Sequence, residues 1–158
     1  MGRDIPGGMW FLRNVLGIAA LLLVAGCGDN QDDAGARRLL ARVQADHYRS
    51  WDRAPGFESR QKSNAPHSDA VDIYVNDIIA EVLAIGEPRD AWPEGSIVVK
   101  DGFDGGELDI IAIMEKPGGG WYWAEYDDDG DPDYSGHPDL CIDCHESGSD
   151  SMRGFGLP

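Results

Sequence analysis

The run Cys141-Ile142-Asp143-Cys144-His145, near the end of the chain, limits what this sequence can fold into more than any other feature. It reads C-x-x-C-H, the attachment signature of a c-type haem. Two thiols at this spacing can bond to the two vinyl groups on one edge of a porphyrin, and the adjacent histidine can then bind the iron. The sequence therefore predicts one covalent haem c, attached through Cys141 and Cys144, with His145 as a ligand of the iron.

Other readings of this run remain open. A reactive dithiol needs only C-x-x-C and normally lies at the start of a helix in a thioredoxin-like unit, which this acidic, glycine-rich tail does not resemble. A zinc site could recruit His137 and the run, although the adjacent Cys144 and His145 would reach one tetrahedral ion only with difficulty. A disulfide between Cys141 and Cys144 would close a very small, strained loop. The haem is favoured, the more so because the chain carries an export signal.

The start of the chain is typical of such a signal. Two arginines precede an apolar run, residues 15–24, that is too short to span a bilayer. The run ends in Val24-Ala25-Gly26-Cys27, which resembles the bacterial lipobox. We therefore expect a lipoprotein signal peptide in residues 1–26 and a lipid on Cys27, the first residue of the mature chain. The alternative is a secreted protein cleaved at an ordinary small-residue site.

The rest of the chain divides into a short tether and one domain. Residues 27–35 begin with the lipidated cysteine and continue as a polar stretch, so we expect a flexible tether. Residues 36–158 are long enough for one compact domain, which would hold the haem. This organisation predicts an exported protein that faces the periplasm and contacts a bacterial membrane only through its lipid anchor.

Charge limits the partners of this chain. Its formal net charge is -16 at pH 7, which repels nucleic acid and anionic lipid headgroups. Seven of its cations lie between Arg37 and Lys62, whereas residues 101–158 carry 15 acids against Lys116 and Arg153. The C-x-x-C-H end is thus acidic and would favour a cationic redox partner such as a small cytochrome. Solubility alone is the simpler explanation of so much charge. No nucleic-acid binding is expected.

The domain begins with a helical pattern. Apolar positions at helical spacing run from Ala36 to Trp51, so we expect one amphipathic helix with His47 on its buried face as a packed core histidine. Residues 54–69 are rich in proline, glycine and serine and should form a loop.

Downstream the period changes from helical to alternating. A strand over residues 71–75 is followed by a helix that Asn76 caps and Gly86 ends. Beyond this helix, alternation predicts three strands joined by short turns, with large aromatic side chains in the last one: residues 96–100, 108–115 and 121–126. We therefore predict an α+β domain, an antiparallel β-sheet meander with flanking helices and a single C-terminal c-type haem site.

The acidic segment 127–133 has two interpretations. A calcium loop beginning at Glu125 would have Gly136 rather than Glu at its twelfth position, and Pro132 would interrupt it. A solvated acidic turn is the simpler expectation. The chain has no phosphate-binding glycine loop and no G-x-S-x-G, so nucleotide-binding and hydrolase functions have no support.

Four stretches follow one another in an order typical of one protein family. They are Asp72-Ile-Tyr-Val-Asn76, Trp92-Pro-Glu-Gly-Ser-Ile-Val-Val-Lys100, the aromatic strand Trp121-Tyr-Trp, and C-x-x-C-H near the end. In this order they resemble the cytochrome P-460 family. The likeness covers about residues 65 to 158 and is looser before that. C-x-x-C-H is not specific to this family, but an aliphatic strand ending in lysine at this place is considerably more so.

The resemblance implies a specific haem chemistry. Members are small antiparallel-sheet haem proteins, often homodimers, in which a lysine bonds covalently to a haem meso carbon, and Lys100 matches that lysine. The cross-linked relatives oxidise hydroxylamine, with nitric oxide or nitrous oxide and nitrite among the products. The similar cytochromes c′-beta lack the cross-link and bind nitric oxide or carbon monoxide. An ordinary strand-end lysine that reaches water is the alternative for Lys100.

The far side of the iron would decide between an enzyme and a carrier. An electron-transfer cytochrome uses a second strong ligand, commonly Met or His, whereas turnover of a small nitrogen substrate needs an open position with an acid or base nearby. Met114 should be strand core, and Met152 follows His145 too closely to wrap round. We therefore interpret the position as open. Four side chains are candidates for the proton-handling group: His137, Asp133, Glu146 and His67.

The sequence thus predicts a periplasm-facing mono-haem c oxidoreductase that acts on hydroxylamine or nitric oxide and passes electrons to a cationic cytochrome. The alternatives are a gas-binding or electron-transfer cytochrome of the same fold and, more remotely, a metal-binding lipoprotein without haem. The tail after His145 departs from the family pattern, because only Phe155 remains of an aromatic closing segment. Such a change could abolish hydroxylamine turnover and still leave a haem protein.

Overall fold

The computed structural model describes residue 1 and residues 31–63 and 66–158. The predicted signal peptide, apart from residue 1, and the predicted lipidation site Cys27 lie outside the described residues, as do residues 28–30 of the predicted tether. Among the helices of the described ranges, none is long and apolar enough to cross a membrane.

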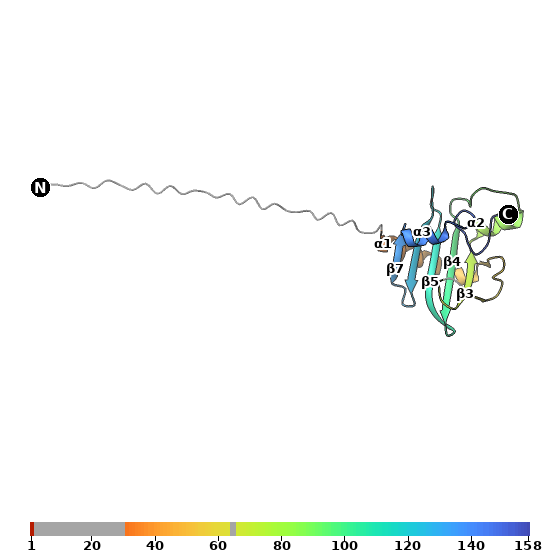
Figure 1. Ribbon diagram of the computed structural model, residues 1–158, viewed down its shortest axis with the longest axis horizontal. Coiled ribbons are helices and arrows are strands. Elements are labelled where there is room, and N and C mark those ends of the chain that lie inside the picture. Colours follow the sequence, from red (N-terminus) through yellow and green to blue (C-terminus); the bar gives the residue numbers. More distant parts are fainter. Residues whose placement is uncertain (2–30, 64–65) are drawn as a thin grey trace.

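A seven-stranded antiparallel sheet forms the middle of the domain (Figure 1). Its strands lie in the order β1-β3-β4-β5-β6-β7, and β2 pairs with β3. The strands are β1 (Asp52–Arg53), β2 (Gln61–Lys62), β3 (Ala70–Val75), β4 (Ile97–Asp104), β5 (Glu107–Glu115), β6 (Tyr122–Asp127) and β7 (Pro132–Gly136). The described helices are α1 (Asp33–Ala45), α2 (Asp77–Ile85) and α3 (Asp139–His145), with a short 3-10 turn, η1 (Tyr48–Ser50). The predicted α+β class with an antiparallel meander is confirmed, because consecutive strands from β3 to β7 are neighbours.

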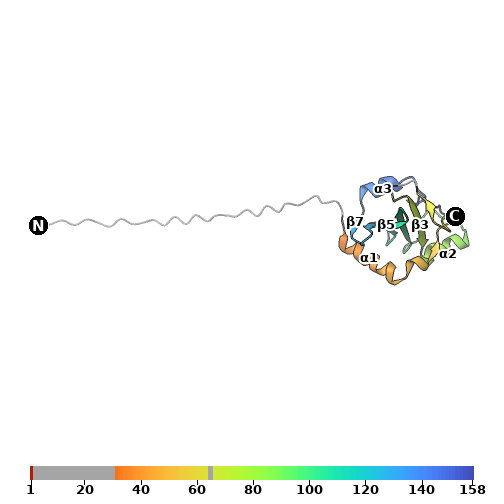
Figure 2. The same cartoon turned by 90° about the horizontal axis from the view of Figure 1, so that it is seen from below.

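Helices lie on both faces of this sheet, with α1 on one face and α3 on the other (Figure 2). The alternation of β4 distributes its side chains between two cores, because successive residues of a strand point to opposite faces. Ile97 and Val99 pack with the apolar side chains of α1, whereas Val98 packs in the core on the other face. That second core also contains side chains of α2 and of the C-terminal tail.

The strand that was predicted to end at Lys100 is longer. β4 continues to Asp104 and turns through Gly105 and Gly106, whose φ angles are 56° and 96°. Positive φ at both central positions of a two-residue hairpin is favourable for glycine and strained for most other residues. Lys100 therefore lies in the interior of the sheet, opposite Ile73 of β3, rather than at a strand end.

The first helix begins earlier and ends sooner than the sequence pattern predicted. Asp32 caps α1 by accepting a hydrogen bond of 2.8 Å from the backbone N–H of Gly35, so the helix includes part of the expected tether. The helix ends at Ala45, and His47 adopts a left-handed conformation with a φ of 53°. The prediction of one helix to Trp51 with His47 in the core was wrong. A left-handed residue cannot continue a right-handed helix, and the His47 side chain is exposed.

Both ends of α2 agree with the prediction. The side-chain oxygen of Asn76 accepts hydrogen bonds from the backbone N–H groups of Ile79 (3.4 Å) and Ile97 (3.1 Å). Asn76 therefore caps the helix and also ties it to the start of β4. Gly86 ends the helix in a left-handed conformation with a φ of 68°.

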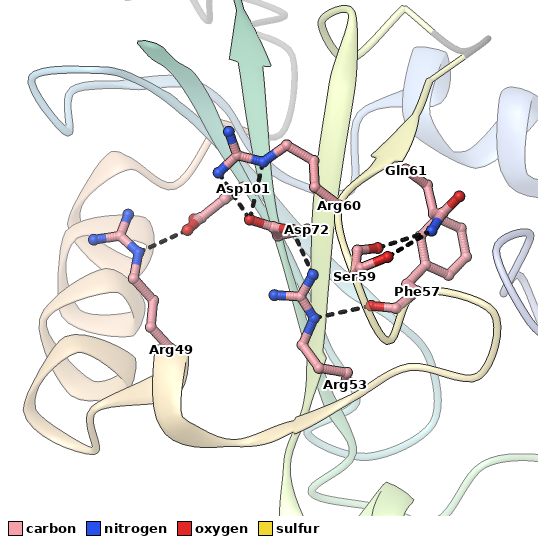
Figure 3. Close-up of polar contacts among 8 residues, drawn as sticks. All are labelled: Arg49, Arg53, Phe57, Ser59, Arg60, Gln61, Asp72 and Asp101. Carbon is pink, nitrogen blue, oxygen red and sulfur yellow. Dashed lines mark hydrogen bonds and ion pairs between the residues drawn. The ribbon is translucent and has the colours of Figure 1, made fainter. Parts of the chain in front are cut away.

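Two buried carboxylates on the α1 face hold the segment before β3 against the sheet (Figure 3). Asp72 of β3 and Asp101 of β4 lie opposite one another and are 7% and 1% exposed. Arg53 and Arg60 both bind Asp72, and the Arg49 guanidinium donates a hydrogen bond of 2.7 Å to Asp101. Because a buried carboxylate without a partner is costly, these ion pairs fix the path of the segment that carries the arginines.

Two elements near the C-terminus, β7 and α3, were not predicted. The sequence of β7 lacks alternating apolar residues, and its pairing with β6 defines it as a strand. The acidic segment between β6 and β7 is a tight turn, in which the backbone N–H of Asp131 donates to Asp127 Oδ1 at 2.8 Å and Gly130 has a φ of 86°. This agrees with the simpler of its two interpretations.

Candidate functional site

A cavity of about 660 Å³ lies on the face of the sheet opposite α1. Strands β3 to β6 form its floor, and its other walls come from residues of the 57–67 loop and the C-terminal segment 140–155. Its volume is typical of small-molecule and cofactor sites, which are about 300–1,000 Å³. Most of its lining is apolar, and its charged, histidine and cysteine side chains are Lys62, His67, Lys100, Glu125, Cys141, Cys144, His145 and Arg153.

The C-x-x-C-H run forms α3 and places its two thiols on one wall of this cavity. Cys141 and Cys144 are three residues apart on a helix and therefore share a face. Both are half-buried, and no disulfide joins them. Burial raises the pKa of the Cys141 thiol to about 11. The Arg153 guanidinium donates to the carbonyl oxygen and Sγ of Cys144, each at 3.1 Å, which fastens α3 to the tail that follows it.

His145 is held at the end of α3 from two sides. Its Nδ1 lies 2.9 Å from the carbonyl oxygen of Ser151, and its ring lies against the Trp123 ring with a centroid separation of 4.7 Å. A carbonyl oxygen can only accept, so Nδ1 carries the hydrogen. Burial lowers the pKa of His145, which favours the neutral imidazole. In that tautomer Nε2 has a free lone pair that can bind a metal ion.

The structure brings His67 to the same cavity and pairs it with a residue that the sequence analysis missed. His67 Nδ1 lies 2.7 Å from Glu125 Oε2, and the two side chains are 17% and 19% exposed. The His67 ring centroid is 6.4 Å from that of His145. Glu125 was considered only as a calcium ligand. The sequence did contain a signal for Glu125. In a strand, residues two apart point to the same face, so Glu125 lies on the same face of β6 as the buried Trp123.

Lys100 also lines the cavity. Its neighbours across the strands are Ile73 and Ala112, so its stem is surrounded by apolar side chains. Burial lowers the pKa of the Lys100 amine, and the nearby Glu125 carboxylate opposes this effect. A lysine with these surroundings is the kind of amine that can act as a nucleophile.

The other three proton-handling candidates do not line the cavity. His137, Asp133 and Glu146 are all exposed. The His137 ring packs against Tyr122 at a centroid separation of 6.3 Å, and the carbonyl oxygen of Asp133 accepts a hydrogen bond from Gln31. Nearness in sequence to C-x-x-C-H was misleading, because β7 contributes only Tyr134 to the lining of the cavity and these three side chains lie outside it. Of the four predicted candidates, the structure brings only His67 to the site.

The short tail after α3 closes one side of the cavity. It reverses direction at Asp150 and Ser151, whose φ angles are 48° and 65°, and a bridge between Ser149 and Met152 completes the turn. This reversal buries Met152 to 4% exposure in the cavity wall, which also contains Met114. Met114 belongs to the strand core as predicted, whereas Met152 reaches the cavity despite its short separation from His145.

Within the described residues, no three His, Cys, Asp or Glu side chains are grouped so that they could hold a metal ion. A haem iron takes protein ligands only along one axis, so one or two side chains suffice for it and this finding does not bear on a haem site. No protein-family model matches the chain, and no curated protein matches it.

Proposed function

We propose that this protein is an exported mono-haem c redox protein whose haem occupies the cavity beside α3. The observation that carries the proposal is that Cys141, Cys144 and His145 together line one wall of a largely apolar cavity. Two thiols on one helix face suit two thioether bonds to the edge of a porphyrin, and the next residue is the histidine that such a site needs for the iron.

The other walls fit a haem in size and in chemistry. The lining side chains of β3, β4 and β6 include Val71, Ile73, Val98 and Trp123, which suit the apolar body of the macrocycle. Lys62 and Arg153 also line the cavity and can pair with the two carboxylates that a haem carries.

The residues around His145 prepare it to bind the iron. Ser151 accepts the Nδ1 hydrogen, which leaves Nε2 for the metal and fixes the tautomer. The edge-to-face contact with Trp123 restricts rotation of the ring. When bound, the haem supplies an iron that exchanges electrons and binds small molecules.

Oxidation of hydroxylamine or reaction with nitric oxide is the activity that we propose, with electrons passed to a cationic cytochrome on the periplasmic side of a bacterial membrane. The resemblance to the cytochrome P-460 family supports this activity. So does Lys100, a desolvated amine that faces the cavity where a cross-link to the haem would form. Glu125 offers a proton acceptor inside the cavity, beside His67, which was one of the four predicted candidates for this role.

A gas-binding or electron-transfer cytochrome of the same fold is the second candidate. One observation favours it. The His67 and His145 rings face the same cavity with centroids 6.4 Å apart, so a second strong ligand for the iron is at hand.

Expression of the full chain with c-type haem maturation tests the proposal. We expect one haem c per chain in the pyridine haemochrome assay and a haem peptide that contains Cys141 and Cys144. Replacing both cysteines with alanine should abolish covalent haem, whereas Cys27→Ser should leave it unchanged. A strongly red-shifted ferrous band, a peptide that joins Lys100 to the haem, and catalytic reduction of an artificial acceptor by hydroxylamine would support the enzyme.

Two other results would change the conclusion. A wild-type protein without covalent haem would overturn the proposal. An ordinary c-type spectrum, with Lys100 unmodified and at most one equivalent of acceptor reduced, would favour the second candidate.

A further inference from the structure

We infer that His67 is the second axial ligand of the haem iron in the resting protein, on the side opposite His145. This inference rests on the proposed function, because it assumes that a haem occupies the cavity. It differs from the sequence-based expectation of an open position. It also gives Glu125 a defined task, which is to hold the His67 ring.

The separation of the two rings agrees with binding to one iron. Imidazole nitrogens bind first-row metal ions at about 2 Å and lie about 1 Å from their ring centroid, so histidines on opposite sides of one ion have centroids about 6 Å apart. The His67 and His145 centroids are 6.4 Å apart. Aromatic rings that pack directly also have centroids about 4.5–7 Å apart, so the distance alone does not decide.

The hydrogen bonds of the two histidines supply the decisive observation. Each ring uses Nδ1 for a strong acceptor: His145 at 2.9 Å from the Ser151 carbonyl oxygen and His67 at 2.7 Å from Glu125 Oε2. Both rings therefore leave Nε2 as the ring nitrogen that can bind a metal ion. Histidines that bind metal ions almost always donate their other ring N–H to a carbonyl or carboxylate, because that bond fixes the tautomer and makes the ligand more basic. Two such arrangements meet in this cavity.

The residues that follow His67 are attached to the sheet firmly enough to present a ligand. The Ser68 hydroxyl donates to Asp109 Oδ2 at 2.6 Å, and the backbone N–H of Asp69 donates to the Phe103 carbonyl at 3.1 Å. Both contacts join the loop to the end of the sheet just after His67. The imidazole is 17% exposed and therefore lies mostly within the protein.

Other side chains that could bind the iron lack this preparation. Met114 and Met152 are buried in the apolar core, and the amine of Lys100 is on the strand that the family resemblance assigns to a cross-link. With His67 on the iron, a small molecule such as nitric oxide would have to displace it. The rate at which such a ligand binds should therefore rise when His67 is removed.

Spectroscopy of the haem-loaded full chain tests the assignment after the haem content has been measured. We expect a low-spin ferric signal in optical and EPR spectra of the wild type and a high-spin signal in His67→Ala, with low spin restored by added imidazole. Glu125→Gln should remain low-spin and have a higher midpoint potential, because the ligand loses an anionic hydrogen-bond partner. His137→Ala, which removes an exposed histidine outside the cavity, is the matched control and should behave as wild type.

Three other results would overturn either the assignment of His67 or the proposed function. A haem-loaded wild type that is high-spin overturns the assignment of His67 and leaves the proposed function intact. A His67→Ala protein that stays low-spin also overturns it and identifies another side chain as the ligand. A wild type that carries no covalent haem overturns the proposed function, and this inference with it.

Discussion

Charged side chains are buried or partly buried on both faces of the sheet, and the residues that they pair with differ between the two faces. On the α1 face, Asp72 and Asp101 are bound by arginines, whose charge does not change in the physiological range. On the cavity face, Glu125 is paired with a histidine and lies near Lys100, whose pKa is lowered. A largely buried amine whose pKa is shifted and that lies in a cavity is typical of functional sites. We therefore assign the first set to stability and the second to chemistry.

Asp72 should make stability depend on pH in the acidic range. Burial alone would raise the pKa of Asp72, but hydrogen bonds from Arg53 and Arg60 outweigh it and lower the pKa. A carboxylate whose pKa is lower in the folded state stabilises above its ordinary pKa of about 3.9, and this contribution is lost as pH falls through the folded value. We expect Asp72→Asn to lower the free energy of unfolding at pH 7 by about 1–3 kcal/mol.

Urea denaturation of both proteins at several pH values between neutral and about pH 3 measures this effect. The stability of the variant should fall less steeply below about pH 4 than that of the wild type. Asp104→Asn, at the exposed β4–β5 hairpin, is the control and should leave the profile unchanged. Parallel profiles for Asp72→Asn and wild type would contradict the prediction.

At the scale of elements, one residue makes three of the contacts that hold the C-terminal tail against the rest of the domain. The Asp150 carboxylate accepts hydrogen bonds from the Trp92 backbone N–H at 2.8 Å and from Lys116 Nζ at 2.6 Å. The Asp150 carbonyl accepts another from the Trp121 indole at 2.8 Å. These contacts join the tail to the loop before β4 and to the turn before β6, so the wall of the cavity that holds Met152 is anchored by Asp150.

Asp150→Ala should therefore loosen this wall. We expect the free energy of unfolding to fall by about 1–3 kcal/mol, because the partly buried Lys116 and the Trp92 N–H lose their acceptor. The fraction of chains that carry the proposed covalent haem should fall as well. Thermal or urea denaturation and the pyridine haemochrome assay measure the two effects. Asp143→Ala, on the exposed side of α3, is the control, and equal losses in both variants would argue against a special role for Asp150.

At the scale of the whole molecule, the face of the sheet opposite α1 carries the site and the surface around that site is acidic. The exposed acids on and beside α3 are Asp133, Asp139, Asp143 and Glu146. Two of these were predicted as acid or base groups of the pocket, and their exposure instead suits them to attract a partner. They add to a chain with a net charge of -16. A cationic cytochrome would meet this surface first.

Electron exchange with a cationic cytochrome should therefore slow as salt is added, because the screening length falls from about 30 Å at 0.01 M to about 10 Å at 0.1 M ionic strength. Stopped-flow mixing of the reduced protein with a cationic and an anionic cytochrome measures this. Neutralising Asp139 and Glu146 together should slow the reaction at low salt and weaken its salt dependence.

The matched control neutralises Asp104 and Glu107 at the β4–β5 hairpin, which lies at the opposite end of the sheet from α3 (Figure 1). Equal effects of the two variants would mean that net charge, rather than the surface at α3, attracts the partner.

The sequence by itself determined the features that depend on residues close together in the chain. Asn76 and Gly86 predicted both ends of α2, and alternation predicted the strands of the meander and the short turns between them. The prediction of two thiols and a histidine for one haem is also local, because C-x-x-C-H is a spacing rule. The error at His47 arose because the helical pattern ran on past a change of backbone direction, whereas β4 continues beyond Lys100, where the predicted strand ended.

Only the tertiary structure decided which side chains share the cavity. His67 and Glu125 are 58 residues apart, and their contact depends on the pairing of β3 through β6 and on the loop that leads into β3. Met152 reaches the cavity because the tail reverses at Asp150. His137, Asp133 and Glu146 lie beside the motif in sequence and outside the cavity in space. A one-residue change in strand register turns every side chain to the other face, so membership of the site follows from long-range pairing that no short motif encodes.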